Sequence, residues 1–246
     1  MSQPLRLYIP GSIAPVTMAI EQAVAALIPP IDVSFDRIAP SGKLAEEIAA
    51  GAPAGVMISA DAGYLDQLRH AGIVSRPRPL AGNALCLIVR PGWETSGLPD
   101  LSRAGVRVAV FQHQDDPCGQ YTRQMIARAG IAASFAEKVQ RGEVIIAPGG
   151  QVLPDAVVSG AADLGVLYAS WASSFADRLT IVELPEPFTM SDRILFTIGV
   201  VDAPARGTVH PDAERFVAFM LGEQGQAILR AARFLPAPAQ AFRPGD

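Results

Sequence analysis

The sequence predicts an α/β fold, and two patterns in it support that class. Short runs rich in Val, Ile and Leu alternate with Ala-rich amphipathic runs of about ten residues, which is typical of βαβ units with a mostly parallel sheet. Of the 246 residues, 50% are hydrophobic and only 18% are charged. That composition can build a sizeable core and excludes a disordered chain.

Each expected strand is an aliphatic run between turn residues, and each expected helix repeats its apolar positions three to four residues apart. The expected strands, in chain order, are Leu5–Ile9, Asp32–Asp36, Gly55–Ile58, Ala84–Val89, Val106–Val110, Leu164–Leu167, Leu179–Glu183 and Phe196–Val201. The expected helices are Val16–Ala26, Gly42–Ala50, Ala62–Ala71, Gly119–Ala129, Leu153–Ser159, Asp212–Leu221 and Gln224–Ala231.

Two long apolar strands follow turn-like segments with no helix before them. One begins after Gly82-Asn83, and the other follows the Pro-containing segment Pro185–Arg193. Strands of this kind can carry the chain out to a second lobe and back. We therefore expect a discontinuous first lobe, 1–83 plus 191–246, and an inserted second lobe, 84–190.

Composition also excludes several function classes. Lys and Arg number 20 against 24 Asp and Glu, a formal charge of −4, so the basic field of a nucleic-acid binder is missing. Cys86 and Cys118 form no CxxC motif, and the three histidines are far apart without HExxH spacing, so no metal site is expected. The sequence has no apolar run long enough to span a membrane.

The N-terminal segment does not read as a signal peptide. Its apolar run is broken by Pro10, Gly11 and Pro15, and no A-x-A-like cleavage site follows. The expectation is either a cytoplasmic chain or a mature chain whose leader has been removed.

Two strand-to-helix turns in the N-terminal part have the chemistry of a ligand site, because ligands of parallel α/β sheets bind at the carboxyl ends of strands. After the first strand, Gly11 lets the backbone approach a ligand and Ser12 offers a hydroxyl; the alternative is that Ser12 is an ordinary N-cap. Before the second helix, Ser41 can cap the helix or face a ligand. Lys43 lies in the first turn, where the helix dipole disfavours a cation, so it either serves an anionic ligand or points into water.

A third turn, Gln112–Tyr121, precedes the helix expected at Gly119. Cys118 at this helix N-terminus can have a lowered pKa and act as a nucleophile with His113 as base, or it can be a small side chain lining a pocket. The sequence contains no GxGxxG, GxxxxGK[ST] or GxSxG motif, and the one glycine pair after a strand is Gly149-Gly150. Enzyme chemistry is not indicated.

With these turns in view, the chain resembles the molybdate/tungstate-binding proteins of ABC importers. The family pattern of serine, leucine, helix and GAPADxxxSAD is similar to Ser41–Asp61, and its PAGxYA turn is similar to Pro117–Tyr121. Further similar segments are Gly82–Leu85, Gly160–Ser170, Phe216–Leu221 and Gln226–Phe234, so the resemblance covers nearly the whole chain.

The resemblance implies a two-lobed periplasmic-binding-protein-like fold of type II, in which the lobes close on a tetrahedral oxyanion in the cleft between them. It implies a periplasmic monomer that works with an ABC permease and uses no cofactor and no coordinated metal. By position, the anion donors would be the hydroxyls of Ser12 and Ser41, the backbone N–H groups of Cys118 and Gly150, and the phenol of Tyr168. Gly11 and Lys43 would lie beside them.

Some positions depart from the family pattern. Lys43 stands where a small hydroxyl residue is usual, Gly149-Gly150 replaces a valine neighbourhood, and Trp171 replaces an aspartate. Three alternatives therefore stay open. They are a receptor for a phosphorylated or carboxylated metabolite with Lys43 as counter-charge, a cytoplasmic sensor of the same fold, and an enzyme using Cys118 and His113.

Overall fold

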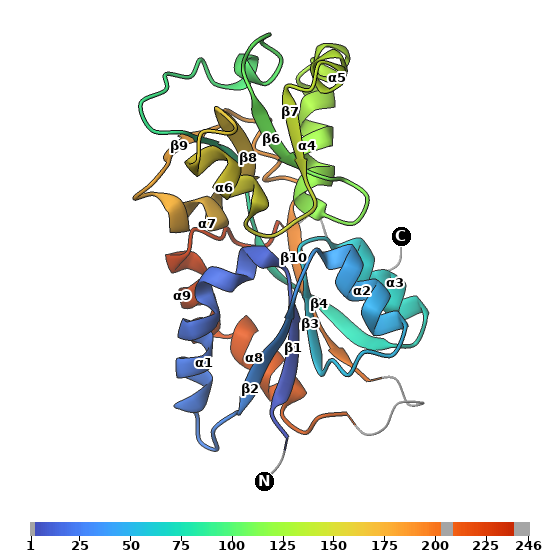
Figure 1. Cartoon of the computed structure of the whole chain (residues 1–246). Coiled ribbons are helices and arrows are strands. Elements are labelled where there is room, and N and C mark those ends of the chain that lie inside the picture. The colour runs from blue at the N-terminus through green and yellow to red at the C-terminus, as the bar shows by residue number, and fades with distance from the viewer. Residues whose placement is uncertain (1–2, 203–208, 239–246) are drawn as a thin grey trace. The chain divides into compact units, whose positions relative to one another are not determined.

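The computed structural model describes residues 3–202 and 209–238, and these divide into two compact units (Figure 1). Unit 1 comprises 1–82 and 194–246, and unit 2 comprises 83–193. Each unit has one five-stranded sheet of its own. No helix among the described residues is long and apolar enough to cross a membrane.

The sheet of unit 1 has the strand order β2-β1-β3-β10-β4, with β1 parallel to both β2 and β3 and β10 antiparallel to both β3 and β4. Helices α2 and α3 lie on one face of the sheet and α1, α8 and α9 on the other (Figure 1). The strands are β1 Leu5–Ile9, β2 Val33–Ile38, β3 Val56–Ser59, β4 Val74–Gly82 and β10 Leu195–Val201. The helices are the 3₁₀-helix η1 Gly11–Val16 and the α-helices α1 Thr17–Ala25, α2 Ser41–Ala49, α3 Ala62–His70, α8 Ala213–Leu221 and α9 Glu223–Ala231.

The sheet of unit 2 repeats this plan with the order β7-β6-β8-β5-β9. Strand β6 is parallel to β7 and β8, whereas β5 is antiparallel to β8 and β9. The strands are β5 Leu85–Val89, β6 Val108–Phe111, β7 Val144–Ala147, β8 Leu164–Tyr168 and β9 Thr180–Glu183. The helices are η2 Leu98–Leu101, α4 Pro117–Arg128, α5 Ala132–Gln140, α6 Val152–Val158, α7 Ala169–Ala172 and η3 Ser173–Phe175.

The α/β class is confirmed. In each sheet four of the five strands run in the same direction, and the sheets are mixed because β10 in unit 1 and β5 in unit 2 run against both of their neighbours. A parallel pair needs a crossover connection of a dozen or more residues, usually a helix. Strands β5 and β10 carry the chain from one unit into the other and have no such helix before them. Each enters its sheet antiparallel to both neighbours. Every residue of β5 and of β10 is buried, which explains their unbroken apolar sequences.

Among the strands and α-helices of the described residues, four elements were absent from the sequence-based expectation: β4, α5, β7 and the short α7. Strand β4 has the sequence VSRPRPLAG, and its two prolines argue against a central strand. In the structure β4 is an edge strand, where a missing backbone donor is tolerated. Helix α5 carries a lysine, Lys138, on its buried face, so its apolar pattern is interrupted.

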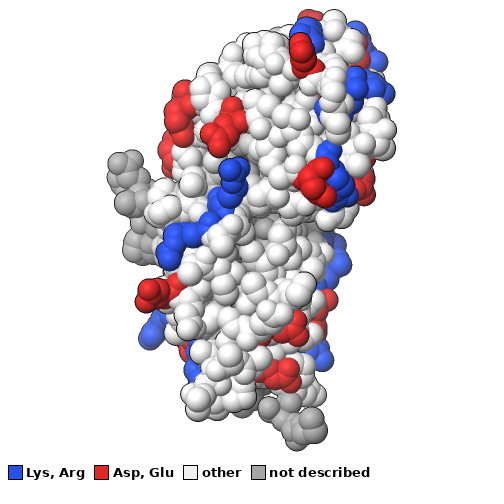
Figure 2. Space-filling model, turned by 90° about the vertical axis from the view of Figure 1, so that its left-hand side faces the viewer, with Lys and Arg blue, Asp and Glu red and all other residues white. Residues whose placement is uncertain are grey.

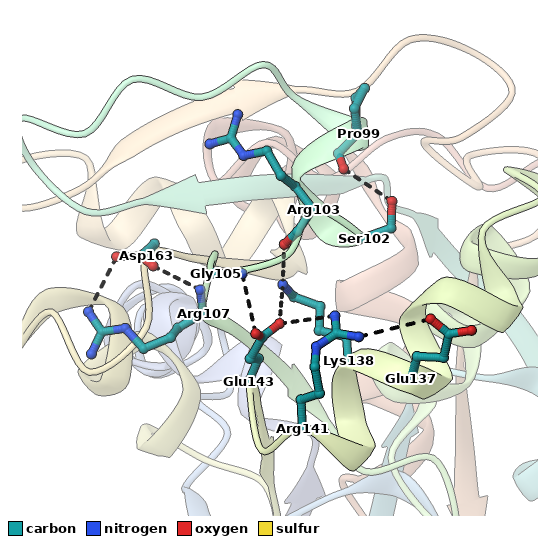
Figure 3. A network of polar contacts seen from close by, with 10 residues as sticks. All are labelled: Pro99, Ser102, Arg103, Gly105, Arg107, Glu137, Lys138, Arg141, Glu143 and Asp163. Carbon is teal, nitrogen blue, oxygen red and sulfur yellow. Dashed lines mark hydrogen bonds and ion pairs between the residues drawn. The ribbon is translucent and has the colours of Figure 1, made fainter.

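Lys138 is fully buried and holds α5 against the segment before β6 (Figure 3). Its Nζ donates to the carbonyl oxygen of Arg103 at 2.5 Å and lies 3.3 Å from Glu143 Oε2. Glu143 also pairs with Arg141 at 3.2 Å. The lysine charge is therefore buried with a carbonyl and a carboxylate, as buried charges require.

Candidate anion-binding site

The carboxyl ends of β1, β2 and β3 lie at one edge of the unit 1 sheet, because these three strands are parallel neighbours. The turn with Gly11 and Ser12 follows β1, and α2 starts with Ser41 after β2. The hydroxyl oxygen of Ser41 accepts a hydrogen bond from the N–H of Ala60, just beyond β3, at 2.9 Å. This bond ties the start of α2 to the end of β3.

Ser12 is 3% exposed, and its Oγ has no hydrogen-bond partner within the described residues. It lies inside the 3₁₀-helix η1, whose N-cap is Pro10, so the interpretation of Ser12 as an N-cap is wrong. Burying a hydroxyl without a partner costs about 1–3 kcal/mol. A ligand oxygen is one partner that could satisfy it.

Ser41 is fully buried and is the first residue of α2, while Pro40 holds the N-cap position without a side-chain cap. Of the two alternatives for Ser41, the helix cap is therefore wrong. Since its oxygen accepts from Ala60, its O–H remains the group that can donate to an acceptor. The two serines thus differ, because Ser41 already supports the fold and Ser12 does not.

Lys43 lies in the first turn of α2, as expected. Its Nζ pairs with Glu46 Oε2 at 2.9 Å, and its side chain is 43% exposed. A lysine neutralised on its own helix surface is a poor counter-charge for a buried ligand. The organic-anion alternative that depends on Lys43 is not favoured.

In unit 2 the carboxyl ends of β7, β6 and β8 likewise meet at one edge of the sheet. Helix α4 follows β6 at very close range: a Cβ on Gly119 would lie 2.0 Å from the backbone oxygen of Gln112. Only glycine allows the helix to begin there. Tyr168 is the last residue of β8, and Gly150 lies exposed in the loop between β7 and α6, with φ of +62°.

Cys118 and Tyr168 are in contact, because the Tyr168 backbone forms a hydrogen bond with the Cys118 thiol. They are 2% and 3% exposed, respectively. Burial, with a smaller effect from Asp116, raises the pKa of the Cys118 thiol well above its ordinary value. Of the two alternatives for Cys118, the low-pKa nucleophile is therefore wrong, since the reactive form is the thiolate. His113 is exposed.

Asp116 is the residue that sequence reasoning missed. It caps α4: its Oδ1 accepts from the N–H groups of Cys118 at 2.9 Å and Gly119 at 3.3 Å. The carboxyl is buried, and burial outweighs these hydrogen bonds, raising its pKa to about 7. The signal was present in the sequence as an Asp directly before Pro117, a typical N-cap followed by proline at the first helical position.

An aromatic pair packs at the same edge of the unit 2 sheet. Trp171 of α7 stacks on Phe111, the last residue of β6, with ring centroids 5.8 Å apart and planes 10° from parallel. Trp171 is 5% exposed.

A cavity of about 400 Å³ lies elsewhere in unit 1. It is lined by Pro4 and Arg6 around the start of β1, by Gly55 before β3, and by Val201 at the end of β10. These residues mark the amino ends of β1 and β3, the opposite edge from Ser12 and Ser41. None of the predicted site residues lines it.

On the face drawn in Figure 2, basic and acidic side chains are interspersed and much of the surface is uncharged. Among the described residues, no group of three or more His, Cys, Asp or Glu side chains is placed to hold a metal ion.

Comparisons with known proteins show which family the chain belongs to. The molybdate-binding protein ModA of Mycobacterium bovis is 29% identical over 210 residues, which cover 84% of this chain and 74% of the relative. The periplasmic molybdate-binding protein of Azotobacter vinelandii has a similar structure, with a TM-score of 0.79 and 20% identity over 94% of this chain and 98% of that one. The sulfate-binding protein SubI of Mycobacterium tuberculosis has a TM-score of 0.78 and 18% identity, over 98% of this chain and 89% of that one.

The two structures confirm the two-lobed fold class of periplasmic binding proteins. Residues 5–235 match the family model described as bacterial extracellular solute-binding protein. The chain therefore belongs to the bacterial extracellular solute-binding proteins, a family of binding proteins and not of enzymes.

Proposed function

We propose that this protein captures a tetrahedral oxyanion, molybdate or tungstate, and delivers it to an ABC permease. The observation that carries the proposal is the Ser12 hydroxyl, buried without a partner at the carboxyl edge of β1. Ser41 begins the neighbouring helix with an O–H available to donate. The relatives named as molybdate-binding proteins support the choice of ligand.

Neutral donors are sufficient to hold such an anion. A hydrogen bond to a charged group contributes about 1.5–3 kcal/mol, and helix N-termini add a favourable field for negative charge. In the proposed site the hydroxyls of Ser12 and Ser41 come from unit 1. The backbone N–H groups of Cys118 and Gly150 and the phenol of Tyr168 come from unit 2. Selection between molybdate and the smaller sulfate then depends on the size of the space that these donors enclose.

We propose that units 1 and 2 act as two lobes that close on the anion before it is delivered to a membrane permease. We infer a periplasmic location and a monomeric state. Small-angle X-ray scattering tests closure: saturating molybdate should lower the radius of gyration, and an unchanged radius despite tight binding would argue against hinge motion.

A thermal-shift screen tests the ligand. Molybdate, tungstate, sulfate, phosphate and a set of organic phosphates and carboxylates are compared at equal concentration. At a thousandfold excess over Kd, a ligand adds about 4 kcal/mol of stability, which raises Tm by about 8–16 °C for a chain of this size. A shift with molybdate and tungstate is expected. A shift only with an organic anion would refute the proposed ligand.

A further inference from the structure

The first turn of α4 has no vacant backbone donor in the described structure. Pro117 has no N–H. The N–H groups of Cys118 and Gly119 both donate to Asp116 Oδ1, at 2.9 and 3.3 Å, and the N–H of Gln120 donates to the Asp116 carbonyl at 3.0 Å. Asp116 is 8% exposed, so water does not readily replace it. An oxyanion at this helix terminus has to share or displace the Asp116 carboxylate.

An ionised Asp116 also repels an anion at these donors, and its surroundings do not offset that charge. Asp115 in the same loop carries a like charge, and the Cys118 thiol of α4 lies beside Asp116. Behind that thiol are Cys86 of β5 and the backbone of Tyr168 at the end of β8. In the part of the chain that the structure describes, no positively charged side chain shifts the titration of Asp116.

We propose that Asp116 is a residue of the oxyanion site and that the anion binds when Asp116 is protonated, so that binding takes up one proton from solvent. The inference rests on the proposed function, because it takes the N–H of Cys118 to be a donor to the anion. A neutral carboxyl is a weaker acceptor than a carboxylate, so it releases this N–H more readily. Its own O–H can then donate to an anion oxygen.

The direction of the pH dependence follows from this linkage. Burial raises the pKa of Asp116 to about 7 in the free protein. Below that pH the carboxyl is already neutral, and Kd is independent of pH. Above that pH, binding of each anion requires Asp116 to take up a proton, so Kd rises by about tenfold per pH unit. The rise ends where the protein with an ionised Asp116 begins to bind the anion.

Calorimetric titration with molybdate between pH 6 and 9 tests the proposal, using two buffers of different ionisation enthalpy to count protons. We expect uptake of close to one proton at pH 8.5 and of much less than half a proton at pH 6. In Asp116→Asn the uptake disappears and Kd becomes independent of pH, because Asn keeps the N-cap without the charge. The matched control is Asp61→Asn. Asp61 caps α3 by accepting from Gly63 N at 2.8 Å, and this variant should keep the pH dependence of the original protein.

The outcomes separate the two proposals. Molybdate binding with a constant Kd and no proton uptake overturns the role of Asp116 and leaves the proposed function standing. Proton uptake that persists in Asp116→Asn assigns the proton to another group and also overturns it. No binding of molybdate at any pH overturns both. If Asp116→Asn is not folded between pH 6 and 9, the number of protons taken up by the original protein decides the proposal by itself.

Discussion

Replacing Ser12 by Ala should separate ligand binding from stability. In the free protein the Ser12 hydroxyl is buried without a partner among the described residues, so its removal leaves no group unsatisfied. The free energy of unfolding should stay unchanged or rise by up to about 1 kcal/mol. The bound oxyanion loses one charge-assisted hydrogen bond of about 1.5–3 kcal/mol, so Kd for molybdate should weaken by about 10- to 150-fold.

Replacing Ser41 by Ala should weaken binding to a similar degree but also destabilise the protein. The N–H of Ala60 is buried and loses its acceptor at 2.9 Å. An orphaned buried donor costs about 1–3 kcal/mol, so urea unfolding should show a lower midpoint with an unchanged m value. We therefore expect Ser12→Ala and Ser41→Ala to lose similar amounts of affinity for molybdate, whereas only Ser41→Ala loses stability.

Thr197→Val is the matched control for these measurements. Thr197 in β10 is 1% exposed, and its Oγ1 also has no hydrogen-bond partner within the described residues. Valine has the same shape without the hydroxyl, so this variant should keep its affinity for molybdate. The assay is isothermal titration with molybdate beside urea unfolding. Full affinity in Ser12→Ala would refute the site assignment, and an equal loss in Thr197→Val would show that the effect is not local.

The remaining predictions concern unit 2. Burial favours a neutral Asp163, but its hydrogen bonds with Arg107 and Arg90 outweigh burial and hold the pKa of this carboxyl below its ordinary value. Asp163→Asn should therefore lower the free energy of unfolding at pH 7 by about 1–2 kcal/mol. The difference between the two proteins should shrink as the pH falls below about 4, where the carboxylate protonates. A constant difference in urea unfolding down to pH 2.5 would contradict this. The raised pKa of the Cys118 thiol predicts that iodoacetamide modifies it only on unfolding, and stoichiometric labelling of the native protein within minutes at pH 7 would count against the buried assignment. Gly119→Ala should cost about 1–3 kcal/mol or more in thermal unfolding, because its Cβ would overlap backbone oxygens, whereas Gly63→Ala meets only the Asp61 side chain and should cost less.

The fold class and most elements were predictable because their causes are local. Aliphatic runs such as Leu85–Val89 lie between turn residues and form buried strands, and the repeat of Leu44 and Ile48 forms the inner face of α2. Asp61 directly before α3 caps that helix, and Cys86 within the apolar run of β5 is buried, so both also follow from local sequence. The sequence did not predict β4, whose prolines suit an edge strand, or the elements α5, β7 and α7. It also did not predict the one reversed strand of each sheet.

The candidate site was predictable only in part. The turns after β1, β2 and β6 were identified from glycine, serine and proline, and they do lie at the carboxyl edges of the two sheets. The state of each polar group could not be read from the sequence. Lys43 pairs with Glu46, and the Cys118 N–H donates to Asp116.

By itself, then, the sequence determined the α/β class, the order of most strands and helices, and the turns that face the carboxyl edges. These depend on periodicity and turn chemistry within about ten residues. Only the tertiary structure decided which strands are neighbours, that Ser41 binds a residue 19 positions away while Ser12 has no described partner, and that burial brings Asp116 to a pKa of about 7. Strand pairing, hydrogen-bond partnership and desolvation all depend on segments distant in the chain, and no local pattern contains them.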